Sequence, residues 1–362
     1  MIRLKVSTEF AGRFQKYLLS GEYKDTFSYS KSEYWQYHSR MADIKIENDS
    51  IILDGKSGFY FPPRARLSDS GANLFLTLKR KYGKLFTVLK NRLILHSSEP
   101  RSFDYFTAFD KVMNHHPISD HDLASYRINF RELQKKSNSI KSINEMKKEF
   151  FAKNKYKLHD NMIKAYYHFN ILNGYTNLDS LKVILEIGAG NGNFSSLLYY
   201  TIPNSTVLIV DLPETLCFSM PFIAELFPDA RLLMPHEADD FNAGNYNFVF
   251  LTPKQINRIK DNSVDLAINA ESFQEMTKRQ IVEYFELIQR SGKNNSYFFT
   301  TNRVEKIPRG PESYVKETIE LPNRFSEYPW NSKNEVLIYE ICKLKRLVQL
   351  DNIYMRLERL KK

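Results

Sequence analysis

Val183-Ile-Leu-Glu-Ile-Gly-Ala-Gly-Asn-Gly-Asn-Phe-Ser-Ser-Leu-Leu198 is the stretch that decides the fold of this 362-residue chain. Its first five residues are apolar and β-branched enough for a buried parallel strand, and residues 194–200 have the spacing of a helix packed on a sheet. Between them, Gly188, Gly190 and Gly192 let the backbone turn tightly and approach a ligand. This order predicts the start of a doubly wound α/β sheet with a nucleotide-bearing cofactor at the turn.

The spacing of the glycines separates two classes of cofactor. A dinucleotide site needs G-x-G-x-x-G, in which the helix N-terminus faces a pyrophosphate. Here the pattern is E-x-G-x-G-x-G, which resembles motif I of class I S-adenosylmethionine-dependent methyltransferases. That cofactor carries a sulfonium and an ammonium group and no phosphate, so a buried acid beside the glycines suits it better. The resemblance implies that the cofactor is held by Glu186, Gly188, Ala189, Gly190 and Gly192.

A second apolar run ends in another acid. Ser205-Thr-Val-Leu-Ile-Val-Asp211 predicts a strand whose final carboxylate lies 19 residues after Gly192. An acid at this place can accept hydrogen bonds from both ribose hydroxyls, and Leu212 would then lie against the adenine face. Methyltransferases and dehydrogenases share this acid, so alone it does not distinguish them. A doubly wound domain that has kept no cofactor is the alternative.

Strand and helix patterns alternate over the rest of the second half. Helices are predicted at 157–173, 213–227, 255–259 and 277–290, and strands at 231–235, 247–253, 264–269 and 296–301. Which of the strands at 231–235 and 247–253 is the third of the sheet is open. The alternation predicts a mostly parallel, Rossmann-like sheet with helices on both faces and with ligands at the carboxyl ends of the strands.

The segment after the strand at 264–269 offers candidates for catalysis. Asn269 is expected near the methionyl end of the cofactor. Methyl transfer to a hydroxyl is an in-line displacement, so the enzyme aligns the reactants and removes a proton. Glu275 or Glu271 could be the base if a partly dry pocket raised its pKa, and His236 could act with an ordinary pKa. Alternatively, Glu275 only complements a helix dipole and His236 is a loop residue.

The first half is predicted to be a separate region. Residues 1–175 are predicted to be a mainly helical cap that recognises the substrate, and residues 176–362 the cofactor-binding domain. Helices are expected at 10–19, 74–89, 103–113 and 143–151, with a hairpin over 45–60 whose turn follows Leu53. The pair His115-His116 is read as a surface loop because no second group of ligands accompanies it, and the acids at 237–240 are weak evidence for a divalent ion. No metal is predicted.

Charge and cysteine content restrict the partners. The net charge of +10 comes wholly from residues 1–178, which hold 30 Lys and Arg against 18 Asp and Glu. The densest basic stretch, 79–92, could meet nucleic acid, anionic lipid or substrate phosphates, or could be a solvated helix face. The two cysteines, Cys217 and Cys342, match no metal or redox spacing, which fits a reducing cytoplasm. No secretory signal and no run of about 18 apolar residues are present, so no membrane span is expected.

Several further segments resemble the bacterial sugar O-methyltransferase family. They are Asp211-Leu-Pro-Glu-Thr215, Glu225-Leu-Phe-Pro-Asp-Ala230, Phe250-Leu-Thr-Pro253, Asp265-Leu-Ala-Ile-Asn269, Ser272-Phe-Gln-Glu-Met276, Thr301-Asn-Arg-Val-Glu305 and Tyr328-Pro-Trp330, with a weaker match at Ser57-Gly-Phe-Tyr-Phe-Pro62. The resemblance covers about residues 160–355. It implies a cytoplasmic enzyme of surface-polysaccharide synthesis that methylates a hydroxyl of a nucleotide-linked or lipid-linked sugar.

Other substrates are weighed against a sugar. The Asp-Leu-Pro element is also similar to small-molecule O-methyltransferases of secondary metabolism, which usually carry a histidine base after the fourth strand, where this chain has none. Nucleic-acid methyltransferases acting on exocyclic amines commonly have [N/D/S]-P-P-[Y/F/W] there, which this chain lacks. A non-catalytic partner protein with the same fold is the third alternative. The expected partner is a small-molecule or glycan substrate able to carry a phosphate, with no specific nucleic acid; the oligomeric state stays open.

Overall fold

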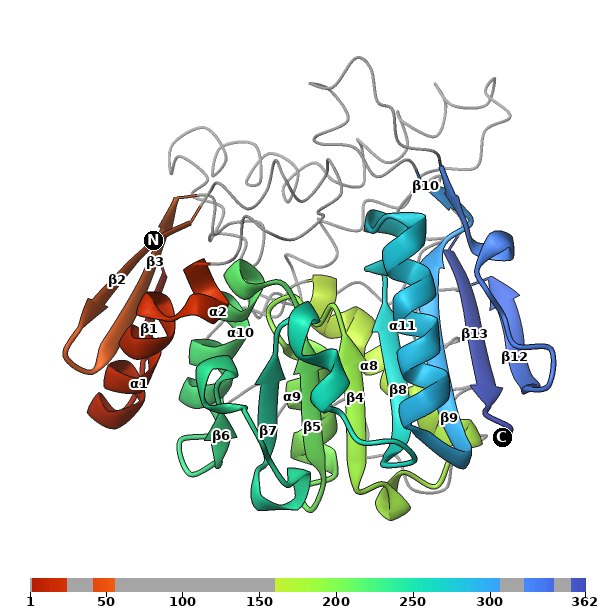
Figure 1. Ribbon diagram of the computed structural model, residues 1–362, viewed down its shortest axis with the longest axis horizontal. Coiled ribbons are helices and arrows are strands. Elements are labelled where there is room, and N and C mark those ends of the chain that lie inside the picture. Colours follow the sequence, from red (N-terminus) through yellow and green to blue (C-terminus); the bar gives the residue numbers. More distant parts are fainter. Residues whose placement is uncertain (1, 25–41, 56–159, 307–321, 342–352) are drawn as a thin grey trace, which may run out of the picture.

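A central eight-stranded sheet organises the molecule (Figure 1). The computed structural model describes residues 2–24, 42–55, 160–306, 322–341 and 353–362. In spatial order the strands are β12 (Glu335–Ile341), β13 (Ile353–Arg359), β9 (Gly292–Arg303), β8 (Val264–Ala270), β4 (Val183–Ile187), β5 (Thr206–Val210), β7 (Phe248–Leu251) and β6 (Leu232–Leu233). The six strands from β9 to β6 pair in parallel, and β13 pairs antiparallel with both β9 and β12.

The strand order reverses direction at β4. From β4 the chain adds β5 and then β7 on one side, and later returns to add β8 and β9 on the other side. In a doubly wound sheet, such a reversal leaves a crevice outside the carboxyl ends of the two central strands. The loops that follow β4 and β8 therefore border the expected ligand site.

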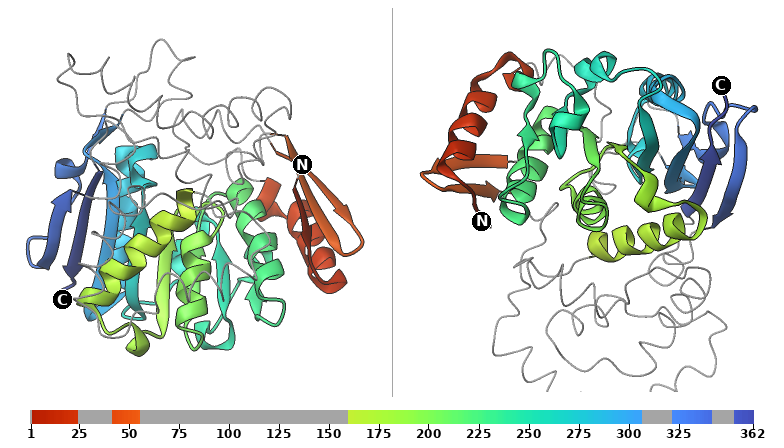
Figure 2. Two further views of the ribbon diagram at one scale, coloured as in Figure 1. Left: turned by 180° about the vertical axis from the view of Figure 1, so that it is seen from behind. Right: turned by 90° about the horizontal axis from the view of Figure 1, so that it is seen from below.

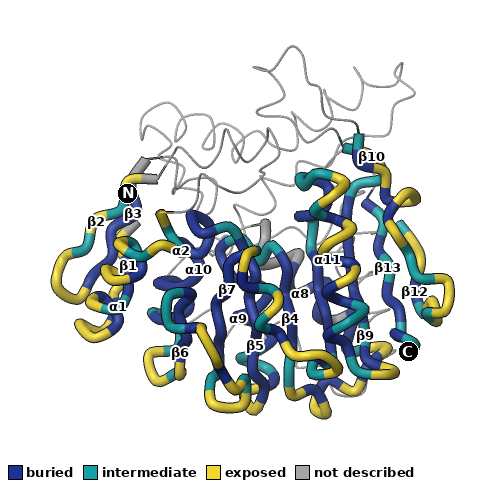
Figure 3. Tube along the Cα trace, viewed as in Figure 1, coloured by how far each residue is buried: buried dark blue, intermediate teal, exposed yellow. Residues whose placement is uncertain are grey.

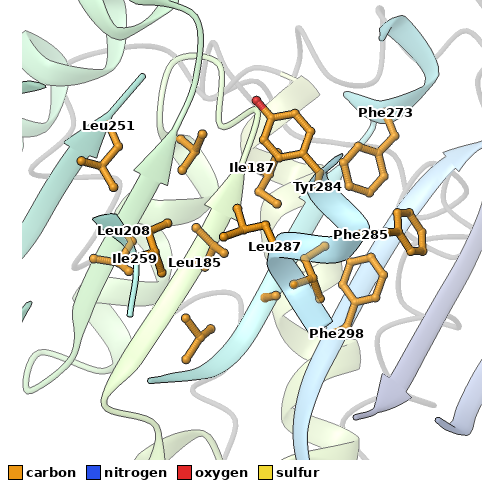
Figure 4. Close-up of a cluster of buried hydrophobic side chains, with 14 of the residues drawn as sticks. Leu185, Ile187, Leu208, Leu251, Ile259, Phe273, Tyr284, Phe285, Leu287 and Phe298 are labelled. Atoms are coloured by element: carbon orange, nitrogen blue, oxygen red, sulfur yellow. The ribbon is translucent and has the colours of Figure 1, made fainter. Parts of the chain in front are cut away.

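Helices cover both faces of the sheet (Figure 2). The longer ones are α8 (Asp160–Tyr175), α9 (Asn193–Thr201), α10 (Pro213–Leu226) and α11 (Lys278–Ser291). Alternate residues of each strand point to opposite faces. Ile184 of β4 packs with α8 and α9, whereas Leu185 and Ile187 pack with α11. Figure 4 shows part of the apolar cluster that Leu185 and Ile187 form with α11. The central strands are buried along their length (Figure 3).

Short 3-10 helices form many of the connections. They are η4 (Leu178–Ser180), η5 (Pro235–Glu237), η6 (Ala243–Asn245), η7 (Pro253–Arg258), η8 (Phe273–Glu275) and η9 (Phe325–Glu327). A two-stranded hairpin, β10 (Glu305–Lys306) and β11 (Asn323–Arg324), extends from the carboxyl end of β9.

The N-terminal segments pack against the edge of this unit beside α10 (Figure 1). They comprise β1 (Ile2–Lys5), α1 (Thr8–Leu19), α2 (Gly21–Lys24), β2 (Ala42–Glu47) and β3 (Ser50–Gly55), with β3 between β1 and β2 in an antiparallel sheet. Phe14 and Tyr17 of α1 are fully buried in one cluster with residues of α10, β5 and β7. The Tyr17 hydroxyl donates to the Pro213 carbonyl at 2.9 Å. These segments share their core with the α/β unit.

The mostly parallel, doubly wound fold predicted from the sequence is confirmed, as is the helix at 10–19. β7 is the neighbour of β5, and β6 lies outside it, which decides the question of the third strand. The predicted hairpin turn is wrong for Asp54 and Gly55, which lie in β3 and pair with Asp43 and Ala42 of β2. The turn that the structure describes lies at 48–49, where Asn48 adopts φ +40°, and residues 56–60 of the predicted hairpin lie outside the described part.

Other predictions concern residues outside the described part. These are the helices at 74–89, 103–113 and 143–151, the basic stretch at 79–92, the histidine pair at 115–116 and Cys342. The division at residue 175 stays a prediction. α8, which ends at Tyr175, packs with α9 against the sheet. None of the described helices is long and apolar enough to cross a bilayer.

Replacing Phe14 with Ala should reduce the free energy of unfolding by about 3–5 kcal/mol, because the fully buried ring would leave a cavity. Leu19→Ala is the matched control, since Leu19 lies on the same helix and is 63% exposed; it should change stability by less than about 0.5 kcal/mol. Urea denaturation of both variants makes the comparison. If Phe14→Ala and Leu19→Ala lowered the free energy of unfolding equally, α1 would not share the core in solution.

Candidate functional site

The glycine loop leaves β4 in a backbone conformation that requires glycine. Gly188, Gly190 and Gly192 have φ values of +72°, +61° and +81°, which L side chains rarely adopt. A Cβ atom on Gly188 would lie 2.0 Å from the Ser272 Oγ, whereas nothing lies within 4 Å of a Cβ on Gly190. Gly188 is thus needed for packing between two loops, and Gly190 borders open space in which a ligand can lie against the backbone.

Asp211 joins the end of β5 to this loop. Its carboxylate accepts hydrogen bonds from the amide nitrogens of Gly190 and Leu212, both at 2.8 Å. Each oxygen keeps one further acceptor position, because a carboxylate offers about four. Burial raises the pKa of Asp211 to about 8, although the two amide bonds oppose the rise. The neighbouring carboxylates of Glu214 and Glu186 raise this pKa further.

Glu186, on the neighbouring strand β4, is a second buried acid whose pKa is raised. It is 2% exposed and accepts a hydrogen bond from the Ser195 hydroxyl in the first turn of α9. Burial raises its pKa to about 7, and the bond from Ser195 opposes the rise. No cationic side chain among the described residues pairs with Glu186 or Asp211. Two buried acids beside the glycine loop suit a ligand that supplies cationic groups and hydroxyl donors.

The remaining predicted cofactor residues are also at this edge. The Ala189 carbonyl accepts a hydrogen bond from the Gly192 amide and so closes the loop, and Leu212 is the N-cap residue of α10. Asn269 is fully buried, and its side-chain amide donates to the Ile187 carbonyl at 3.0 Å and to Ser272. Its oxygen accepts from the Phe273 amide and from Asn302. This side chain holds the loops together; contact with the cofactor's methionyl end stays a prediction.

Glu271 and Glu275 follow β8 directly opposite the glycine loop. Glu271 has φ +63°, a conformation that is strained for a residue with a side chain and that often occurs at functional sites. Glu275 forms an ion pair with Lys306 at 2.9 Å, and both side chains are largely buried. Burial raises the pKa of Glu275, and the Lys306 ammonium opposes this rise. Both candidate bases thus lie in the segment that follows β8, whose Ser272 packs against Gly188 of the glycine loop.

His236 lies elsewhere, in η5 after the edge strand β6. Two strands, β7 and β5, separate it from β4. Its ring lies 6.1 Å from that of Tyr17, and its Nδ1 is buried with no hydrogen-bond partner in the described residues. Burial lowers the pKa of His236. It is therefore separated from the two glutamates and from the glycine loop.

The acidic run after His236 has other partners. Glu237 accepts two hydrogen bonds from Arg13 of α1, at 2.8 and 2.6 Å, and Asp239 pairs with Arg258. Among the described residues, no group of three His, Cys, Asp or Glu side chains is arranged to hold a metal ion. Through Glu237, this run fastens α1 to the α/β unit.

Sequence reasoning missed several residues of the site. They are Ser195, Ser272, Asn302, Lys306 and Asn323. Ser195 could have been suspected, since it is in the first helical turn after the glycines. Ser272 and Asn302 lie in segments that carry the family resemblance but received no role of their own. Lys306 and Asn323 carry no local signal, because their partners lie on other elements of the fold.

No protein-family model matches the sequence, and a search of curated proteins gives no match. Similar solved structures include a candidate sarcosine dimethylglycine methyltransferase from Galdieria sulphuraria, with TM-score 0.40 and 12% identity over 66% of this chain and 98% of that one. Magnesium protoporphyrin IX methyltransferase from Synechocystis PCC 6803, with bound SAH, has a TM-score of 0.37 and 10% identity over 67% of this chain and 100% of that chain.

A SAM-dependent methyltransferase from Aquifex aeolicus gives a TM-score of 0.35 and 14% identity over 55% of this chain and 89% of that chain. Scores and identities at this level do not transfer a function. The function therefore has to be argued from the residues of the site.

Substituting alanine at Gly188 and at Gly190 should have different consequences for stability. Gly188→Ala forces a backbone shift against Ser272 and should cost about 3 kcal/mol or more, whereas Gly190→Ala adds only left-handed strain of about 1–2 kcal/mol. Thermal and urea unfolding of the two variants measure the difference. A Gly190→Ala variant as unstable as Gly188→Ala would contradict the open space beside Gly190.

Glu186→Gln should change how stability depends on pH. The folded-state pKa of about 7 lies above the unfolded value of about 4.3, so the folded wild type holds a proton that the unfolded chain releases in this window. Wild-type stability then falls as pH rises between these values, by up to about 1.4 kcal/mol per pH unit. The stability of the Gln variant relative to wild type should rise from pH 5 to pH 7 and level off above. A difference independent of pH would contradict the raised pKa.

Proposed function

We propose that the chain is an S-adenosylmethionine-dependent methyltransferase that transfers the methyl group to a hydroxyl oxygen. The observation that carries the proposal is the pair of buried carboxyls, Glu186 and Asp211, which no cation of the described residues neutralises and which flank a glycine loop whose backbone is open at Gly190. The glycine spacing favours this cofactor over a dinucleotide, because Asn193 stands where a G-x-G-x-x-G pyrophosphate site has its third glycine.

The residues present fit the groups of that cofactor. Asp211 has two acceptor positions left for the ribose hydroxyls, and its hydrogen bond to Gly190 fixes the loop beside them. Glu186 supplies negative charge behind the glycines, where a sulfonium or ammonium group can be attracted directly or through water. The bound cofactor supplies an electrophilic methyl group. The protein has to orient it, exclude water and remove the acceptor's proton.

The proton acceptor is proposed to be Glu275 or Glu271. Both follow β8, whose loop presses on Gly188 through Ser272. A carboxylate with a raised pKa in a largely buried place is a better base than an exposed one. His236 is the weaker candidate, because it follows β6 at the edge of the sheet.

The proposed acceptor class is a sugar hydroxyl of a nucleotide-linked or lipid-linked sugar. The support is the resemblance of segments 211–215, 265–276 and 301–305 to the sugar O-methyltransferase family. A small molecule of secondary metabolism is the second candidate, supported by the Asp-Leu-Pro element at the end of β5. Turnover of UDP-glucose or of other nucleotide-linked sugars, compared with phenolic acceptors, separates the two classes.

Asp211→Ala should weaken S-adenosylmethionine binding about 30-fold or more, because two charge-assisted hydrogen bonds to the ribose are worth about 1.5–3 kcal/mol each before compensation. Isothermal titration calorimetry with S-adenosylmethionine and with S-adenosylhomocysteine measures this. Asp229→Ala is the matched control, since Asp229 is an exposed acid after the other end of α10.

Asp211→Asn separates ligand binding from folding, because the isosteric amide can still accept from one of the two amide nitrogens. Equal affinity of wild type and Asp211→Ala would contradict the role of Asp211. The proposal as a whole fails if the wild type gives neither binding heat nor a rise in melting temperature with either ligand.

A further inference from the structure

The β10–β11 hairpin is fastened to the segment 271–276 at two points that face each other. Lys306 and Asn323 are direct partners in the antiparallel register of the hairpin. Lys306 Nζ lies 2.9 Å from Glu275 Oε1, and Asn323 Nδ2 donates to the Met276 carbonyl at 2.5 Å. One cross-strand pair thus holds both the side chain of Glu275 and the backbone that follows it.

The same segment is fixed to the strand ends on its other side. The Gln274 amide donates to the Asn302 Oδ1 at 3.0 Å, and the Gln274 side chain accepts from the Arg303 amide at 2.7 Å. Ser272 donates to the Ile187 carbonyl at 3.1 Å. Glu275 is therefore held in one place between the glycine loop and the hairpin.

The Lys306–Glu275 pair is costly as a purely structural device. The two side chains are 8% and 14% exposed, and the desolvation of two charges often cancels their attraction, so an apolar pair would stabilise the fold as well. A pair of the same type lies close by on the surface, between Lys278 and Glu327 at 3.0 Å, with side chains 52% and 41% exposed. The buried pair differs in that it keeps a charge in the segment that follows β8.

The groups around Glu275 act in opposite directions. Burial and the neighbouring Glu271 raise the pKa of Glu275, whereas Lys306 and Arg303 lower it. Lys306 donates a hydrogen bond to the Glu275 carboxylate at 2.9 Å. Its charge and its hydrogen bond are the two strongest influences that lower the pKa of Glu275 against the effect of burial.

We infer that Lys306 is a positioning residue that holds Glu275 in place and ionised, ready to accept the proton of the acceptor hydroxyl. The inference rests on the proposed function. In the step that it serves, the acceptor oxygen forms a bond to the methyl carbon and the carbon–sulfur bond breaks, with its electron pair remaining on sulfur. The hydroxyl proton passes to Glu275, which later releases it to solvent.

The test is a pH titration of the Glu275 side chain by NMR of protein labelled with ¹³C at the glutamate carboxyl carbon, with Glu275→Gln used to assign the signal. In Lys306→Met the pKa of Glu275 should rise by about one unit or more, since a buried ionic partner typically shifts a carboxylate by about 1–3 units. Lys306→Arg should restore most of the wild-type titration. Lys278→Met is the matched control and should leave it unchanged.

A Glu275 titration that is the same in wild type and Lys306→Met overturns the inference. If Lys306→Met does not fold, Lys306→Gln, which keeps a hydrogen-bond donor without the charge, gives the same comparison. S-adenosylmethionine binding is measured in parallel and should change less than about threefold in Lys306→Met. Absence of binding to the wild type would defeat the proposed function, whereas normal binding with an unmoved titration defeats only the assignment of Lys306.

Discussion

The hydrogen bond from the Gly190 amide to Asp211 is the interaction on which the geometry of the site depends. It joins the ends of β4 and β5, and the Gly188 amide reinforces the junction by donating to the Val210 carbonyl at 2.8 Å. The loop can take this path only because its glycines tolerate positive φ. On the opposite side Ser272 fills the space that a side chain at Gly188 would need. The crevice at the reversal of strand order is therefore shaped by backbone on one side and by the segment 271–276 on the other.

This arrangement places two carboxyls where water is excluded, which is unfavourable for their charged forms. Neutral donors, the Ser195 hydroxyl and two amides, compensate for only part of the lost hydration. A ligand bearing positive charge and hydroxyl donors, as in the proposed function, would stabilise the charged forms of both carboxyls. Binding and deprotonation of the acids are then coupled, since each favours the other. The acceptor side is different, because Glu275 already has Lys306 as a counterion.

The fold was predictable because its signals are local. The strand Val183–Ile187, its glycines and the following helix are contiguous, and the acid that completes the site ends the next strand. The position of β6 outside β7 was not predictable, since both segments are short apolar runs and only pairing with β5 distinguishes them. The turn at 48–49 was missed for a related reason. Asp54-Gly55 has turn-forming composition, but β3 is extended there by hydrogen bonds to β2, and tertiary pairing overrides the local preference.

The two sides of the site differ in how far apart along the chain their hydrogen-bonded residues lie. On the cofactor side, Glu186 meets Ser195 after nine residues, and Gly190 meets Asp211 after 21. On the side of Glu275, the partners of residues 269–276 include Asn302, Lys306 and Asn323, which lie 28 to 50 residues further along on other strands. Local spacing can encode a loop that binds a common cofactor, whereas an acceptor site built by pairing strands leaves only scattered polar residues in the sequence. The proposed acceptor side therefore depends on contacts between the ends of β8, β9 and the β10–β11 hairpin, where Lys306, which no motif contains, pairs with Glu275.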